Sequence, residues 1–244
     1  MKKRKGIILA AGNGTRLYPL TYAVSKQMLP VYDKPLIYYP IATLQSFGIK
    51  DILIIAKNIS DMKMFQAMVS NIESNFSFAI QKRPTGIPAA FTIGHKFIGD
   101  DDVSLILGDN LFDGQFPVYN NKNMIYGVRT RTPELYGVID FENKKIVEKP
   151  TQFISNYAVP GLYHFDNTVV KKASNLEPSG RGELEIVDII NQYIKEDNLQ
   201  IETLSDDMAW FDCGNHEHLL EAGNYVRAIQ NRTSRIVGDI KYGR

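Results

Sequence analysis

The sequence predicts an α/β fold, in which a doubly wound, largely parallel sheet is followed by a β-rich elaboration. Two observations support this prediction. Strand-like and helix-like segments alternate as far as Asp109, as in proteins built from βαβ units, and closely spaced strand-like segments come after it. The chain has 244 residues, of which 44% are hydrophobic and 23% charged, as is typical of a globular protein. No linker or repeat divides the sequence, so we expect one domain over 1–244 with halves at 1–110 and 111–232.

Four short apolar runs in the first half predict strands, because they are rich in β-branched and aromatic residues. Their nearly continuous apolar character indicates burial on both faces, which makes a parallel sheet the expected arrangement. Apolar residues at helical spacing predict the helices between them, and Gly48 is a suitable end for the first. The expected strands are 6–10, 51–56, 76–81 and 103–109, and the expected helices are 35–48, 61–72 and 86–98, the last interrupted by Gly94.

Closely spaced strands dominate the second half. The stretch YGVIDFENKKIVEKP predicts a hairpin that turns at Glu142 and Asn143. An amphipathic pattern predicts a helix over 182–198, and Asn215 is a suitable N-cap for a final helix over 216–232. The sheet of this half is therefore expected to be mixed, with strands at 123–130, 136–141, 144–150 and 159–165.

Charge, cysteine content and hydropathy limit the cellular locations and the binding partners that can be expected of this protein. The formal net charge of +1 gives no overall attraction to nucleic acid or to an anionic membrane, so neither partner is expected. No apolar run is long enough for a transmembrane helix or for a secretory signal. Cys213 is the single cysteine, cannot form an internal disulfide, and is expected to be a small packing residue. A cytoplasmic location is the resulting expectation.

A glycine-containing loop with one arginine follows the first predicted strand. Glycines in Gly12-Asn13-Gly14-Thr15-Arg16 would let backbone N–H groups approach an anion, and the arginine fork matches phosphate oxygens. The dinucleotide-binding fingerprint is incomplete, because Leu17 stands where its third glycine would be, and no Walker lysine follows. The loop is either an ordinary tight turn or a phosphate-binding loop. Lys26, which follows in the same connection, favours the second interpretation.

Two aspartates at the ends of apolar runs suggest a metal site. Asp109 ends the predicted strand VSLILGD, and Asp212 ends AWFD. Ligands of open α/β sheets bind at the carboxyl edge of the strands, and two hard carboxylates suit Mg²⁺. The sequence alone leaves open whether the two meet. The four histidines have no convincing ligand spacing, so a zinc site is not expected.

The stretches LAAGNGTRLYPLT (9–21) and SKQMLPVYDKPLIYYP (25–40) resemble the sugar-phosphate nucleotidyltransferase family, whose pattern is close to L-A-x-G-x-G-T-R-L-x-P-x-T and then K-x-x-L-P-V. The resemblance extends over 5–232. It implies a Rossmann-like, nucleotide-diphospho-sugar transferase type of fold, with a nucleotide-binding first half and a sugar-binding second half. It is greatest to members that transfer a thymidylyl group from dTTP to glucose 1-phosphate, giving dTDP-glucose and pyrophosphate.

The same resemblance implies roles for individual residues. Arg16, Lys26, Asp109 and Asp212 would be catalytic, with Mg²⁺ held by the two aspartates, which stand in motifs G-D-N and W-x-D-x-G. QKRPTGIPAAF (81–91) matches the segment that reads the pyrimidine, although Pro88 and Ala89 depart from it and put base selectivity in doubt. The nucleotide-binding residues would be Leu9, Ala11, Gly12, Asn13, Gly14, Thr15, Arg16, Gln81, Gly86 and Asp109.

Four short motifs of the second half match the sugar-binding motifs of the family: Y-G-V at 136–138, E-K-P at 148–150, N-Y-A-V at 156–159 and G-L-Y at 161–163. Arg181 to Glu185 match R-G-E-L-E, interpreted as packing and loop architecture. The sugar-phosphate-binding residues would be Asn110, Gly137, Glu148, Lys149, Val159, Tyr163 and Trp210.

The expected reaction is a direct displacement, in which the sugar 1-phosphate oxygen attacks the α-phosphorus and pyrophosphate leaves. Alternatives are a preference for UTP or another sugar 1-phosphate, and a non-catalytic nucleotide-sugar sensor; a nicotinamide-dependent dehydrogenase is disfavoured by the incomplete fingerprint. The family resemblance also implies a homo-oligomer. Longer members carry a helical regulatory region beyond the position of Arg244, so a form without that region is expected.

Overall fold

The structure is a computed structural model that describes residues 3–120 and 122–242. The described residues form two compact units, each assembled from segments that are far apart in the sequence. Of the described residues, the first unit contains 5–84, 106–114 and 209–242, and the second contains 3–4, 85–105, 115–120 and 122–208. Both units therefore use residues from either side of position 110.

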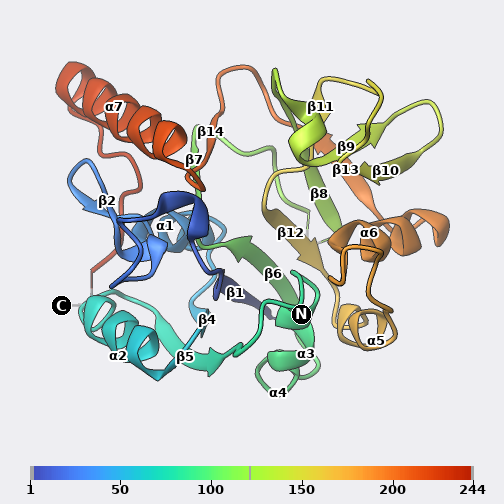
Figure 1. Cartoon of the computed structure of the whole chain (residues 1–244), viewed down its shortest axis with the longest axis horizontal. Coiled ribbons are helices and arrows are strands. Elements are labelled where there is room, and N and C mark those ends of the chain that lie inside the picture. Colours follow the sequence, from blue (N-terminus) through green and yellow to red (C-terminus); the bar gives the residue numbers. More distant parts are fainter. Residues whose placement is uncertain (1–2, 121, 243–244) are drawn as a thin grey trace. The chain divides into compact units, whose positions relative to one another are not determined.

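Three parallel strands form the framework of the first unit (Figure 1). Strand β4 (Asp51–Ala56) lies between β1 (Arg4–Ala10) and β5 (Asn75–Ile80), with Ile8 opposite Ile54 and Ile54 opposite Phe78. Residues 52–56 of β4 are all buried, as their continuous apolar character predicts. The next strand, β6 (Asp102–Leu107), ends just before Asp109, so this aspartate lies at the carboxyl end of a strand as predicted.

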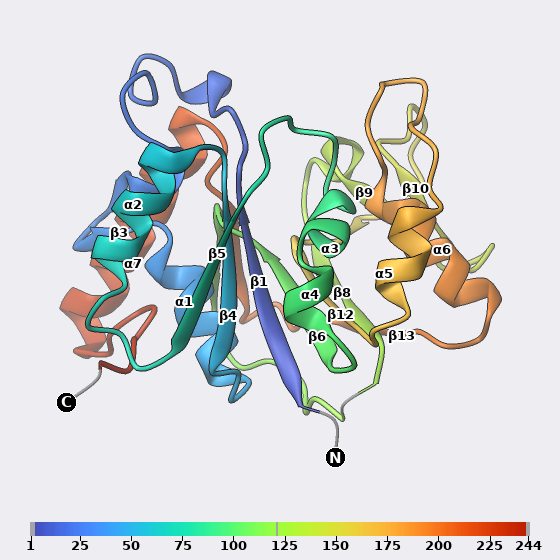
Figure 2. The ribbon, with the colours of Figure 1, turned by 90° about the horizontal axis from the view of Figure 1, so that it is seen from below.

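The first unit also contains the helices α1 (Tyr38–Ser46), α2 (Ile59–Met68) and α7 (His216–Thr233). Asparagine N-caps fix where α2 and α7 begin. The Asn58 side chain accepts from the N–H of Asp61 at 2.8 Å, and the Asn215 side chain accepts from the N–H of His218 at 2.9 Å. The cap at Asn58 places the start of α2 earlier than the predicted 61–72. Figures 1 and 2 both show α2 alongside β4 and β5.

Two small antiparallel pairs carry the loops of this unit. β2 (Pro30–Val31) pairs with β3 (Lys34–Pro35), which explains why α1 begins at Tyr38 and not at 35. β7 (Asn110–Asp113), which the sequence analysis missed, pairs with β14 (Ala209–Asp212), so that Asp212 lies opposite Asn110. Two single-turn 3-10 helices, η1 (Thr15–Leu17) and η2 (Lys26–Met28), hold Arg16 and Lys26.

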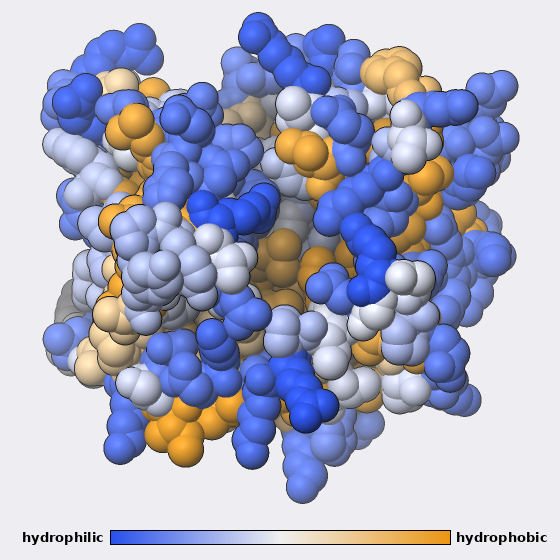
Figure 3. All heavy atoms as spheres, viewed as in Figure 1, coloured by the Kyte–Doolittle hydropathy of each residue, from blue (hydrophilic) through white to orange (hydrophobic). Residues whose placement is uncertain are grey.

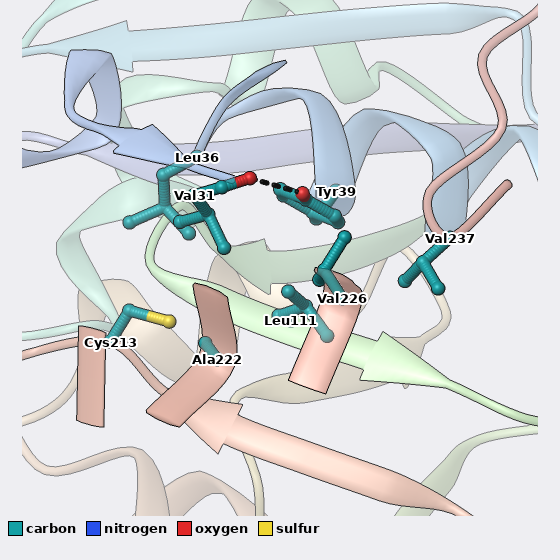
Figure 4. Packing of buried hydrophobic residues seen from close by; sticks show 8 residues of the cluster. All are labelled: Val31, Leu36, Tyr39, Leu111, Cys213, Ala222, Val226 and Val237. Carbon is teal, nitrogen blue, oxygen red and sulfur yellow. Dashed lines mark hydrogen bonds between the residues drawn. The ribbon is translucent and has the colours of Figure 1, made fainter. Parts of the chain in front are cut away.

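A buried hydrophobic cluster packs α7 against the β2–β3 pair and against β7 (Figure 4). The Tyr39 hydroxyl within it donates to the carbonyl oxygen of Val31 at 2.6 Å. Cys213 is fully buried there, which confirms its predicted role as a packing residue. The cluster consists of Val31, Leu36, Tyr39, Leu111, Cys213, Ala222, Val226 and Val237.

The second unit is built on a mainly antiparallel sheet in the order β10-β9-β11-β8-β12, with β13 parallel to β8. The predicted hairpin is confirmed: Lys145 pairs with Asp140, and residues 141–144 form the turn. The strands are β8 (Met124–Arg129), β9 (Gly137–Asp140), β10 (Lys145–Glu148), β11 (Tyr157–Ala158), β12 (Leu162–Phe165) and β13 (Gln200–Thr203), of which β11 and β13 were not predicted.

The helices of the second unit differ from prediction in length. The segment expected as one helix over 86–98 forms two, α3 (Ala89–Ile93) and α4 (His95–Ile98), which are separated by Gly94. The helix expected over 182–198 is α6 (Ile186–Lys195). Residues before α6 form a loop instead, and its contacts are described below. The short helices α5 (Val169–Ser174) and η3 (Pro133–Leu135) were not predicted.

A histidine lies in the interior of the second unit. His164 is 0% exposed, its Nδ1 lies 2.6 Å from Ser104 Oγ, and its Nε2 lies 3.1 Å from the Tyr126 hydroxyl. Burial, reinforced by the positive charge of Arg4, holds the pKa of His164 well below its usual value of 6.5. The ring is therefore neutral in the folded protein at ordinary pH.

The face seen in Figure 3 is mainly hydrophilic, with apolar residues scattered over it in small groups. Among the described residues, no helix is both long enough and apolar enough to cross a membrane.

Candidate active site

The glycine loop of the first unit offers a run of unpaired backbone donors. Gly14 adopts a left-handed conformation (φ 65°), and its carbonyl oxygen accepts from Leu17 N–H and from the Thr21 hydroxyl. The N–H groups of residues 12–16, in contrast, donate to no residue within 3–120 or 122–242. Ala11 is buried, whereas Gly12, Asn13, Thr15 and Arg16 are exposed. A loop of this kind is suited to an anion, as the sequence analysis expected.

Lys26 links this loop to the first of the two aspartates. A Cβ atom placed on Gly12 would lie 3.8 Å from Lys26 Nζ, so the ammonium group lies against the loop. The same ammonium group forms an ion pair with Asp109. Burial alone would raise the pKa of Asp109, but the charge of Lys26 and hydrogen bonds from Lys26 and Asn110 outweigh it and lower the pKa below its usual range.

Asp212 and Arg16 meet at Gly214. A Cβ atom on Gly214 would lie 2.5 Å from Arg16 Nη2 and 2.9 Å from Asp212 Oδ1, so only glycine leaves room for both. Burial, followed by the negative charge of Asp109, raises the pKa of Asp212, against smaller effects of Lys26 and Arg16. The structure thus brings Arg16, Lys26, Asp109 and Asp212 together in one unit, although 103 positions separate the aspartates in the sequence.

The two carboxylates form a donor set for a hard cation. Within residues 3–120 and 122–242, no group of three or more His, Cys, Asp or Glu side chains forms a complete metal cage. Proteins commonly hold Mg²⁺ through one or two carboxylates, and substrate phosphates and waters supply the other ligands. Burial and then the negative charge of Asp109 raise the pKa of Asp212, so added positive charge would favour the ionised form of this carboxylate. The donor set therefore fits Mg²⁺ bound together with a phosphate.

Asn110 and Trp210 lie next to this cluster. The indole N–H of Trp210 donates to Asn110 Oδ1 at 2.7 Å, and Asn110 Nδ2 donates to Asp109 Oδ1 at 3.2 Å. Both residues were expected in the sugar-phosphate set. Their roles stay a prediction, but the structure places them in the first unit with the aspartates.

Gln81, the expected base-reading glutamine, directly follows β5. Its side chain is 5% exposed, and its backbone N–H donates to Ala56 at 2.9 Å. Its side-chain Nε2 is buried without a partner among the described residues. An unpaired buried amide is costly, so this donor is suited to a ligand oxygen. Leu9, the next-to-last residue of β1, accepts from Gly108 N–H at 2.9 Å. Its nucleotide-binding role stays a prediction.

Five of the expected sugar-phosphate residues lie in the second unit, four of them in or beside the strands β9, β10 and β11 and the fifth, Tyr163, in β12. Glu148 is opposite Gly137 across the hairpin, and Gly137 in turn accepts from Val159 N–H at 2.8 Å. Lys149 has a left-handed backbone (φ 42°), which is uncommon for a residue with a side chain. Tyr163 is nearly fully buried in β12, so its side chain belongs to the interior.

Gly86, the other expected base-reading residue, approaches the backbone of Leu184 very closely. A Cβ atom at Gly86 would lie 2.1 Å from the Leu184 carbonyl oxygen, and φ is 103° there, so this position requires glycine. Leu184 N–H donates to Thr85 at 2.9 Å. The two segments form a short bridge within the second unit.

The sequence analysis missed two side chains that contact these residues. His218 Nδ1 donates to the carbonyl oxygen of Asp212 at 2.9 Å, and Arg181 donates to Glu148 at 2.9 Å. The R-G-E-L-E match could have indicated a site residue in the second case, but it was interpreted as loop architecture. No sequence signal connects His218 with Asp212 beyond their spacing of six residues.

Comparisons with known proteins agree with this geometry. Residues 5–228 match the family model described as nucleotidyl transferase. The glucose-1-phosphate thymidylyltransferase of Neisseria gonorrhoeae is 45% identical over 242 residues, which cover 93% of this chain and 84% of that protein. The enzyme of the same name from Mycobacterium tuberculosis H37Rv is 42% identical over 242 residues, with the same two coverages.

Solved structures give the same result for the fold. A crystal structure from Bacillus anthracis in complex with sucrose, assigned to the glucose-1-phosphate thymidylyltransferases, has a TM-score of 0.84 and 35% identity, and the match covers 92% of this chain and 96% of that one. A UDP-glucose pyrophosphorylase complexed with UDP-glucose has a TM-score of 0.79 and 25% identity, over 93% and 99% of the two chains. This chain therefore belongs to the nucleotidyl transferase family.

Proposed function

We propose that this protein transfers a thymidylyl group from dTTP to glucose 1-phosphate, forming dTDP-glucose and releasing pyrophosphate. The observation that carries the proposal is the meeting of Arg16, Lys26, Asp109 and Asp212 beside the unpaired amides of the glycine loop. The names of relatives at 40–45% identity support the choice of substrates.

The chemistry follows from the charges. The attacking oxygen of a sugar 1-phosphate is already anionic, so its main barrier is the approach of one anion to another, which fixed cations and N–H groups lower. Lys26 has three donors, of which Asp109 uses one, so the others can hold the α-phosphate. Arg16 and the loop amides would stabilise the departing pyrophosphate.

The acceptor substrate would be held in the second unit. Lys149 would neutralise the sugar phosphate, and Glu148 would accept hydrogen bonds from sugar hydroxyls. In the first unit, Gln81 Nε2 would donate to a carbonyl oxygen of the pyrimidine, which would give this buried amide its missing partner. Mg²⁺ bound by Asp109 and Asp212 would neutralise phosphate charge.

The decisive experiment is a measurement of pyrophosphate release by the purified protein with a panel of nucleoside triphosphates and sugar 1-phosphates. We expect the highest kcat/KM with dTTP and glucose 1-phosphate in the presence of Mg²⁺. Asp212→Asn should abolish turnover and leave the circular dichroism spectrum unchanged. Near-normal turnover by this variant would contradict the metal assignment. Absence of release with every pair would overturn the enzymatic proposal in favour of a nucleotide-sugar sensor.

A uridylyltransferase is the second candidate. Pro88 and Ala89 stand where the family pattern has A-Q, which removes one polar side chain from the base-reading segment, and one structural relative was solved with UDP-glucose. The methyl group that separates dTTP from UTP is worth only about 1–3 kcal/mol in an apolar pocket, so a modest change there could reverse the preference. Comparing kcat/KM for the two triphosphates decides between them.

The proposal also includes a cytoplasmic location and a homo-oligomeric state. Cys213 is the single cysteine of the sequence and cannot form an internal disulfide, which suits a reducing compartment. The expectation of an oligomer comes from the family resemblance. Light scattering after size-exclusion chromatography would give the number of subunits, and a monomer would remove this part of the proposal.

A further inference from the structure

A histidine at the start of α7 is hydrogen-bonded to the segment that follows the glycine loop. His216 is the first residue of α7, and its Nε2 lies 3.0 Å from the carbonyl oxygen of Tyr18. Because a carbonyl oxygen can only accept, the ring nitrogen is the donor of this bond. The two residues are 198 positions apart, and both belong to the first unit.

Tyr18 lies at the end of the turn that carries Arg16. Its N–H donates to the carbonyl oxygen of Thr15 at 3.2 Å, so Tyr18 closes η1 two residues beyond Arg16. Leu17 is fully buried, whereas Arg16 and Tyr18 are exposed. Exposed turns with few buried contacts open locally at little cost in free energy unless other bonds hold them. The bond from His216 therefore restricts where η1 can lie.

The α7 side of this hydrogen bond is rigid. Asn215 caps the helix by accepting from His218 N–H at 2.9 Å, and His218 Nδ1 donates to the carbonyl oxygen of Asp212, also at 2.9 Å. Cys213 N–H donates to the carbonyl oxygen of Asp109 at 2.9 Å. The first turn of α7 is therefore fixed to the strand ends that carry both aspartates.

Two contacts connect the same pair of segments. Arg16 Nη2 is the atom that a Cβ atom at Gly214 would approach to 2.5 Å, and the Tyr18–His216 bond lies two residues further along each segment. An arginine side chain has many rotamers, so its contact at Gly214 alone leaves the backbone of η1 free to shift. The bond to the Tyr18 carbonyl fixes the backbone from which Arg16 extends.

We propose that His216 is a positioning residue of the nucleotide site, which holds η1 through the Tyr18 carbonyl so that Arg16 stays directed at the phosphates that leave as pyrophosphate. This inference rests on the proposed function, because it concerns the role given there to Arg16. Removal of the His216 side chain should weaken the binding of dTTP and of pyrophosphate. It should leave the KM for glucose 1-phosphate unchanged, because no contact of His216 involves the residues assigned to the acceptor sugar.

The first test is the binding of inorganic pyrophosphate, with Mg²⁺, to the full chain by isothermal titration calorimetry, which needs no turnover. For His216→Ala, we expect the Kd for pyrophosphate and the KM for dTTP each to rise roughly fivefold, as for the loss of one hydrogen bond. His95→Ala is the matched control and should keep wild-type values. His95 Nδ1 also lies 2.9 Å from a backbone carbonyl oxygen, that of Thr92, but in the second unit.

Substitution by amides separates the hydrogen bond from a general effect on α7. The side-chain nitrogen of glutamine is as many bonds from Cα as the histidine Nε2, whereas that of asparagine is closer to the backbone. His216→Gln should therefore recover most of the affinity for pyrophosphate, and His216→Asn should not. Equal affinities of these two variants would overturn the proposal. A fall in melting temperature with equal loss for both substrates would assign a structural role and overturn it as well.

A double-mutant cycle tests whether the effect passes through Arg16. In an Arg16→Gln background, His216→Ala should have little further effect on the Kd for pyrophosphate, because the group that it positions is already absent. An undiminished further rise would mean that His216 acts independently of Arg16, and would overturn the proposal.

The failure of this inference differs from failure of the proposed function. A wild-type protein that binds pyrophosphate and turns over its substrates, while His216→Ala keeps the wild-type Kd and KM, would overturn the role of His216 alone. A wild-type protein that binds pyrophosphate but releases none with any substrate pair would overturn the proposed reaction, and the Kd of His216→Ala would still test the positioning role. A wild-type protein that does not bind pyrophosphate would overturn both.

Discussion

The candidate site depends on the absence of a Cβ atom at Gly214. Arg16 and Asp212 both lie where a Cβ atom of residue 214 would be, so their arrangement requires glycine there. Lys149 is a second position with a special local geometry. Its backbone is left-handed, a conformation that costs conformational energy in a residue with a side chain.

Gly214→Ala should lower kcat/KM by roughly 100-fold, because the added methyl group would displace the Arg16 guanidinium, and small misplacements at an active site have effects of that order. Pyrophosphate release under subsaturating substrate is the measurement. Gly180→Ala is the control, since a Cβ atom there meets nothing within 4 Å, and it should keep wild-type activity. Equal activities of the two variants would show that Arg16 does not act at Gly214.

Lys149→Gly should be more stable than Lys149→Ala by about 1 kcal/mol, because glycine adopts φ 42° without the strain that a Cβ atom causes there. Both variants should lose activity, since each removes the cation. Urea unfolding of the two variants measures the difference. If Lys149→Ala were the more stable variant, the backbone at this position would carry no strain.

At the scale of elements, the segment that follows α7 is tied to β7 by an ion pair. Arg235 donates to both oxygens of Asp113, at 2.5 and 2.7 Å, and the Tyr225 hydroxyl donates to the same carboxylate at 2.6 Å. Val237, two residues further on, is fully buried in the core cluster of Figure 4. This contact therefore helps to hold the segment after α7 on the first unit.

Arg235→Ala should destabilise the protein by about 1 kcal/mol, a value kept small because the arginine side chain is 51% exposed. Burial alone would raise the pKa of Asp113, but hydrogen bonds from Arg235 and Tyr225 outweigh it and lower the pKa below 3.8. The stabilisation is thus complete above pH 3.8 and is lost as the pH falls through the folded-state pKa. Urea unfolding at pH 7 and in acid measures it, and a difference that persists in acid would contradict this assignment.

For the whole molecule, the main finding is that two compact units arise from interleaved segments. The residues expected to bind phosphate come from 9–16, 26, 109 and 212, yet they belong to one unit. The interior of the other unit contains His164, whose charge state affects the stability of the folded chain.

Stability should fall as the pH drops below about 6.5, because unfolded His164 gains a proton that the buried ring does not bind. The slope from this one group can reach about 1.4 kcal/mol per pH unit. His164→Asn keeps a partner for Ser104 and removes the titration, so its unfolding free energy should vary less between pH 7 and pH 5. Guanidinium unfolding across that range measures it. Parallel pH profiles for both proteins would show that His164 does not control the dependence.

Local patterns in the sequence are enough to predict the strand–helix alternation, the hairpin at Glu142 and Asn143, and the cap at Asn215, because apolar periodicity, turn residues and capping act over a few residues. It also identified, through the family motifs, the charged residues that meet in the first unit. The pairing of Asp212 with Asn110 and the ion pair of Arg181 with Glu148 could be found only in the folded chain. Contacts of this kind depend on strand register and chain crossing over long separations, and local sequence preferences do not specify them.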